Sequence, residues 1–168
     1  MNRSCAYGRG VVLAVLALAA VPGCPNNAPA PGDVPVPEPM NLLLPKRMRI
    51  HPFSDVLDVR RGSQQIEVRI EAVDAFGDPT KMFGEFRFEA YVLKPRSTDR
   101  RGRLLETWDV SIMDGKTNLK HWDNVTRMYV FKLDWNRPSI GRQPFVMRVV
   151  FTSPFTTRFI VERTFERD

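Results

Sequence analysis

The stretches QIEVRIEAV, residues 65–73, and EFRFEAYVLK, residues 85–94, decide the fold class because apolar and polar side chains alternate along both. Their apolar positions are Ile66, Val68, Ile70 and Ala72 in the first stretch and Phe86, Phe88, Ala90 and Val92 in the second. Alternation with period two is typical of a strand with one buried and one solvated face. The charged positions between them are expected to pair across strands, with Glu67, Glu71, Glu85 and Glu89 as partners of Arg69 and Arg87.

The same pattern continues through the chain. It predicts further strands at about 47–51, 104–113, 126–134, 144–152 and 157–165. Turn residues separate them, among them Asp114-Gly115 and Ser153-Pro154. No long window has the apolar spacing of a helix, so we expect at most one helical turn, within residues 114–125.

Residues 46–168 are therefore predicted to form an all-β domain, a two-sheet antiparallel sandwich of about seven to eight strands. An eight-stranded barrel is the alternative, but the predicted strands are short and unevenly spaced. The unit Asp74-x-x-Gly77-x-Pro79 between two strands resembles the first hairpin of immunoglobulin-like extracellular modules. This resemblance implies an immunoglobulin-like sandwich, without the disulfide of antibody domains because no Cys follows Cys24.

Composition supports one folded domain. The chain has 168 residues, of which 43% are hydrophobic and 26% charged, and its net charge is +6. This apolar content is enough for one packed core and argues against wholesale disorder. Two cysteines exclude a disulfide-dense scaffold and a four-cysteine zinc site.

The N-terminus has the organisation of an export signal. Arg3 and Arg9 precede the apolar run VVLAVLALAAV at 11–21, and small residues follow it. A basic region, a short apolar region and a small-residue boundary are typical of a secretory signal peptide, here residues 1–23. The apolar run is short for a membrane-spanning helix, which needs about 20 residues.

Gly23-Cys24 directly behind this apolar run resembles the lipobox of bacterial lipoproteins. The resemblance implies that the Cys24 thiol receives a diacylglyceryl group, that the signal is removed, and that an acylated Cys24, carrying chains such as palmitate, begins the mature protein. The alternative is a plain secretory signal cleaved after residues 17–19, which leaves Cys24 a free thiol. The chain as a whole resembles bacterial envelope lipoproteins with an immunoglobulin-like sandwich, a resemblance that implies no particular activity.

Residues 24–45 are predicted to be a lipidated Cys followed by a tether. The stretch 25–45, PNNAPAPGDVPVPEPMNLLLP, is rich in Pro, which prevents helix and central-strand formation. An extended spacer would lift the domain off a membrane. The run at 42–44 is expected to dock on the domain as an edge segment.

The residues offer little support for catalysis. His51 and His121 are the only histidines, and no nucleophile, nucleotide or metal motif is present. We therefore expect no enzyme, no cofactor and no metal, with a small hydrolase as the less favoured alternative.

Two groups of residues are candidates for binding. Trp122 and Trp135 could stack on sugar rings, which would make the domain a carbohydrate-binding sandwich. Basic residues gather in two predicted loops, 95–103 and 135–143, which antiparallel strand order places at one end. These are Arg96, Arg100, Arg101 and Arg103 in the first loop and Arg137 and Arg142 in the second.

The sequence thus predicts an exported, lipid-anchored protein of the cell envelope whose sandwich is a structural or binding module. Its partners are expected to be a membrane, through the lipid, and an anionic envelope polymer or protein at the basic end. Nucleic acid suits the charge but not an exported protein.

Overall fold

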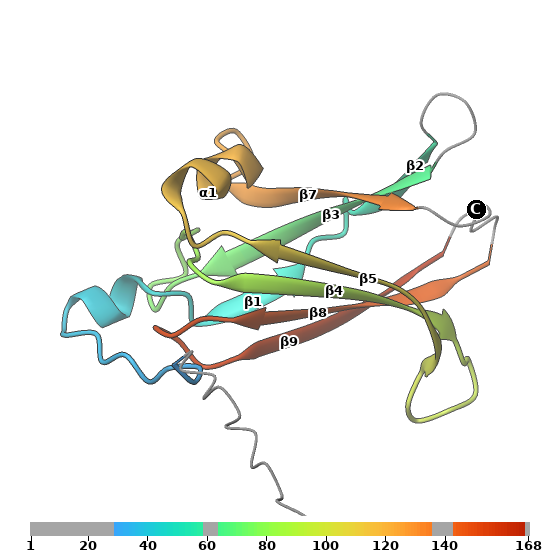
Figure 1. Ribbon diagram of the computed structural model, residues 1–168, viewed down its shortest axis with the longest axis horizontal. Coiled ribbons are helices and arrows are strands. Elements are labelled where there is room, and N and C mark those ends of the chain that lie inside the picture. Colours follow the sequence, from blue (N-terminus) through green and yellow to red (C-terminus); the bar gives the residue numbers. More distant parts are fainter. Residues whose placement is uncertain (1–28, 59–63, 136–142, 167–168) are drawn as a thin grey trace, which may run out of the picture.

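The computed structural model describes residues 29–58, 64–135 and 143–166, and it shows two antiparallel sheets packed face to face (Figure 1). The first sheet contains β1 (Arg47–Ile50), β2 (Asp55–Asp58), β3 (Gln64–Val73), β6 (Trp122–Asp123) and β7 (Met128–Trp135). The second contains β4 (Glu85–Leu93), β5 (Arg101–Ser111), β8 (Phe145–Thr152) and β9 (Phe159–Phe165). The predicted all-β sandwich is confirmed, with nine strands in the described residues.

The strand order is that of an immunoglobulin-like sandwich. One sheet reads β1-β3-β7-β6, with β2 also on β3, and the other reads β5-β4-β8-β9. This matches the A-B-E-D sheet and the C-F-G sheet of that fold, with β5 as an added strand beside β4. The chain crosses between the sheets three times, after β3, after β5 and after β7.

Aromatic side chains from both sheets meet in the core. The ring of Phe131 on β7 lies 4.8 Å from that of Phe86 and 4.9 Å from that of Phe88, both on β4. Phe151 on β8 lies 4.7 Å from Phe86. All four side chains are almost fully buried, so their removal from water is a large share of the hydrophobic stabilisation.

The alternation on β3 and β4 has the predicted register, and the apolar positions are buried in the core except Val92, which is half-buried near the end of β4. The predicted ion-pair partners are in part wrong. Arg69 forms an ion pair with Glu67 on its own strand, and Arg87 forms one with Asp109 on the neighbouring strand β5. Two of the remaining acids pair with other arginines, Glu71 with Arg49 and Glu89 with Arg148, whereas Glu85 forms no ion pair within the described residues.

The helical prediction for 114–125 falls short, because α1 (Gly115–His121) is longer than one turn. Asp114 caps it by accepting a hydrogen bond from the Thr117 amide at 2.9 Å. Buried Asn118 then fixes the helix to the sandwich: its amide donates to the carbonyls of Met82 and Ile112, and its carbonyl accepts from the Tyr129 hydroxyl. The apolar periodicity that predicts helices is absent from α1, because its only buried side chain is the polar Asn118.

The segment before β1 lies against the domain. The amides of Gly32 and Val34 donate to the carbonyls of Ser153 and Pro154 in the β8–β9 loop, at 3.1 and 2.9 Å. A short 3-10 helix, η1 (Met40–Leu43), follows, and its Leu42 carbonyl accepts from the Ala75 amide. The run at 42–44 thus docks as predicted, but on the β3–β4 loop and without forming an edge strand.

The β3–β4 crossing passes close to β8. A methyl group added at Gly84 would overlap the carbonyl oxygen of Thr152 and the ring of Phe151. Glycine is therefore required where the chain changes sheets.

Replacing Phe88 by Ala should destabilise the domain by about 3–5 kcal/mol, because it leaves a cavity beside Phe131. Replacing its exposed neighbour Arg87 should cost well under half of that, since surface ion pairs contribute about 0–1 kcal/mol. Urea denaturation of F88A and R87A measures both losses, and equal losses would contradict the assigned faces.

Candidate functional site

The strand register assigns the loops to two ends of the sandwich. Glu85 pairs with Ser111 on one side and with Thr152 on the other, so the β3–β4 loop, the α1 region and the β8–β9 loop share one end. The segment before β1 lies there too, because Arg47 pairs with Val73. The β4–β5 hairpin, residues 94–100, lies at the opposite end (Figure 1).

The β4–β5 hairpin and the first residues of β5 present three free arginines. Arg96, Arg100 and Arg103 are exposed, and their side chains make no hydrogen bond or ion pair with any residue in the described part of the chain. Such cations attract anions because they do not already face an opposite charge. We name Arg96, Arg100 and Arg103 the basic hairpin.

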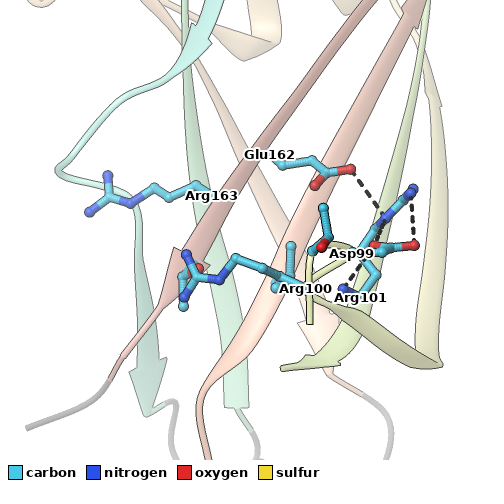
Figure 2. A pocket seen from close by; sticks show the side chains of 8 residues that line it. Asp99, Arg100, Arg101, Glu162 and Arg163 are labelled. Carbon is cyan, nitrogen blue, oxygen red and sulfur yellow. Dashed lines mark hydrogen bonds and ion pairs between the residues drawn. The ribbon is translucent and has the colours of Figure 1, made fainter. Parts of the chain in front are cut away.

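Arg101 differs from these three because it is ion-paired. Its Nε lies 3.0 Å from Oδ1 of Asp99 and 3.4 Å from Oε1 of Glu162, and the side chain is half-buried (Figure 2). The hydrogen bond with Arg101 lowers the pKa of Asp99. Arg101 therefore holds the hairpin on β9, and it is the predicted contact residue least available to an anion.

A cleft of about 450 Å³ lies between the β4–β5 hairpin and β9. Arg100, Arg101 and Arg163 line it together with Asp99 and Glu162. Arg100 and Arg163 extend away from the ion-paired group in Figure 2. Arg163 was missed by sequence reasoning, since it occupies an inward-facing position of β9, where it donates to the His51 carbonyl at 2.5 Å.

The other predicted arginines, Arg137 and Arg142, lie outside the described residues, as does Cys24. The strand positions around them are described. Phe145, at the start of β8, pairs with Val92, so β8 begins at the end of the sandwich that carries the basic hairpin.

The two candidate tryptophans are far apart and packed. Trp135 is 6% exposed, and its ring lies 6.1 Å from that of Trp108. Trp122 pairs with Tyr129 near the start of β7, whereas Trp135 ends that strand. The Lys81 ammonium lies 4.2 Å above the Trp122 ring. The structure therefore does not bring Trp122 and Trp135 together on one stacking surface.

The histidines contact neighbouring groups. Nδ1 of His51 accepts a hydrogen bond from the Phe53 amide, and the His121 ring stacks on Phe131 at 4.8 Å. Among the described residues, no group of three or more metal-ligating side chains is assembled. Within the same residues, no helix has both the length and the apolar character needed to cross a bilayer.

An ion-pair network spans the outer face of the second sheet. Arg148 on β8 lies 2.7 Å from Glu89 on β4 and 3.6 Å from Glu162 on β9, which in turn contacts Arg101 on β5. Partial burial raises the pKa of Glu89, but hydrogen bonds from Arg148 and Tyr91 outweigh it, and the net pKa lies below its usual value. Sequence alternation places these residues on one face but cannot choose among their possible partners.

The comparisons with known proteins give no relative: no family model, curated protein or solved structure matches the chain. The function is therefore inferred from the sequence and the geometry of the domain.

The network predicts a dependence of stability on pH. Because folding lowers the pKa of Glu89, its contribution is complete above the unfolded value of about 4.3 and is lost as pH falls through the folded value. The E89Q variant should lose less stability than the parent chain between neutral and acid pH. Urea midpoints at both pH values test this, and parallel losses in the two proteins would rule out the assignment.

Proposed function

We propose that the protein is an exported bacterial lipoprotein, anchored through Cys24, whose sandwich is a binding module of the cell envelope. The lipobox-like Gly23-Cys24 behind the apolar run supports the anchor. The basic hairpin supports an anionic polymer or an acidic protein surface as the partner.

One observation carries the binding role: the free arginines lie at the opposite end of the sandwich from the segment that leads to Cys24. Gly32 and Val34 hold that segment against the β8–β9 loop, whereas Arg96 and Arg100 occupy the β4–β5 hairpin. A domain attached at the first end presents the second end to the envelope. No acid in the described ranges pairs with these three arginines, so an external anion meets no competitor there.

The anchor is tested on the chain exported from a bacterium. Mass spectrometry of the mature N-terminus should find Cys24 as the first residue, with the mass of a diacylglyceryl group and its acyl chains. The C24S variant should lose this modification and remain unprocessed. A mature N-terminus at residue 20, or an unmodified Cys24 thiol, would sink the proposal.

The binding role is tested by photo-crosslinking in intact envelopes. A photoreactive residue at Ser97, in the exposed hairpin, should give a product with a polymer or protein. Replacing Arg96, Arg100 and Arg103 together by Ser should lower its yield severalfold, about the effect expected when steering charges are removed, and added salt should lower it as well.

A matched control removes the same charge elsewhere. The exposed residues Arg47, Lys132 and Arg158 lie on β1, on β7 and just before β9, and their replacement by Ser should leave the product unchanged. Arg101 is kept in every variant, because its ion pairs hold the hairpin in place. A yield that is insensitive to the hairpin substitutions would mean that these arginines are only solvated.

A further inference from the structure

Exposed apolar side chains gather at one end of the sandwich. Of the 13 large hydrophobic side chains that are exposed among the described residues, nine belong to segments at the end opposite the basic hairpin. Six come from the loop regions there and define the apolar loop end: Phe76, Phe83, Met113, Leu119, Val125 and Phe155. Met40 and Leu43 of η1 lie beside them.

Phe76 and Phe83 lie in the β3–β4 loop, Met113 and Leu119 before and in α1, Val125 in the β6–β7 turn that follows α1, and Phe155 in the β8–β9 loop. The pairings of Glu85 with Ser111 and Thr152 place the β3–β4 loop, α1 and the β8–β9 loop at one end (Figure 1). The β6–β7 turn lies at the same end, because Tyr129 at the start of β7 pairs with Ile70 near the end of β3. Single exposed apolar residues are common on soluble proteins, but a group rimmed by polar residues marks an interaction surface.

The acids at this end are largely occupied by backbone amides. Asp74 accepts from the amides of Phe76 and Asp78, and Asp123 accepts from the amide of Val125. Asp74, Asp123 and the helix cap Asp114 thus fix the backbone of the segments that carry the exposed apolar residues. No backbone amide of the described segments donates to the Asp78 carboxylate.

Lys116 and Lys120 lie on α1 beside Leu119, and both are exposed. Apolar side chains combined with lysines are typical of surfaces that lie in the headgroup region of a membrane.

The length of chain between Cys24 and the domain determines which end meets a membrane. Gly32 is bonded to Ser153 at the apolar loop end, and seven residues lie between it and Cys24. The distance from Cys24 to Gly32 is at most about 29 Å when this stretch is fully extended. An acyl group on Cys24 would therefore hold this end near the bilayer, whatever conformation the intervening residues adopt.

We propose that the apolar loop end rests on a lipid membrane, with Phe76 and Val125 reaching into the headgroup region. The direction of approach rests on the lipid anchor proposed above, but the apolar surface does not. The domain would then stand on the membrane, and the basic hairpin would point away from it.

Environment-sensitive labels test this contact in the membrane-bound full chain. An acylated Cys24 has no free thiol, so single cysteines can be introduced as F76C and V125C. The matched control is F53C, because Phe53 is 72% exposed and Phe76 68%, yet Phe53 lies in the β1–β2 loop next to Ser54, which is bonded to Arg69 midway along β3. All three positions are exposed, so the variants should fold.

In vesicles of phosphatidylethanolamine and phosphatidylglycerol, spin-labelled lipid should quench the labels at 76 and 125 at least about twofold more than the label at 53. Aqueous iodide should show the reverse order. Iodide quenching that is equal at all three positions overturns the proposal. Protection from iodide without quenching by lipid also overturns it, because it indicates a covering protein, such as a second copy of the chain.

The outcomes separate this inference from the proposed function. An acylated N-terminus with fully solvated labels keeps the anchor and refutes the membrane contact. If the exported chain is not acylated, its Cys24 is replaced by Ala and the labelled protein is added to the same vesicles. Lipid quenching at 76 and 125 then supports the surface without the anchor, and the absence of quenching refutes both.

Discussion

The packing of Phe131 between Phe86 and Phe88 is the contact on which the rest of the structure depends. Each ring comes from an inward-facing position, and the separations of 4.8 and 4.9 Å join β7 of one sheet to β4 of the other. A ring seated between two rings of the facing sheet fixes both the separation and the lateral position of the sheets. Because the faces are closed in this way, the loops gather at the two ends. This packing therefore places the basic hairpin at one end of the sandwich and the apolar loop end at the other.

The sequence predicts the strands well where one face of the strand is buried and the other is exposed to solvent. On β3 and β4 the alternation of apolar and charged residues reports burial directly, and even the faces are right. β2 is missed because its two apolar residues, Val56 and Leu57, are adjacent and do not alternate, and β6 is missed because two residues cannot show a period. The helix α1 is missed for another reason: it is attached through the polar residue Asn118, whose side chain forms three buried hydrogen bonds, with Met82, Ile112 and Tyr129. Local pattern encodes burial, but it does not encode a hydrogen-bonded contact between distant segments.

In the candidate site, too, local features could be predicted from the sequence and contacts between distant segments could not. Charge clustering in the sequence identifies the hairpin that carries Arg96, Arg100 and Arg103, because a run of exposed cations is a local property. It does not distinguish Arg101, whose partner Glu162 is far along the chain, nor does it identify Arg163. The sequence gives no reason to separate Trp122 from Trp135, yet Trp122 lies on β6 beside the start of β7, and Trp135 ends β7. Which charges are free and which aromatic rings are neighbours are properties of the assembled sheets.

The contact of residues 32–46 with the domain also has a mechanical meaning. A chain pulled at its N-terminus and held at the β4–β5 hairpin transmits force first through two backbone hydrogen bonds, from Gly32 to Ser153 and from Val34 to Pro154. Further in, β1 is secured by four residue pairs with β3. The segment should therefore peel away before any strand does, releasing roughly 50 Å of chain while the sandwich stays folded. Its docking makes it an extensible link, which lengthens under tension and shortens again when the load is removed.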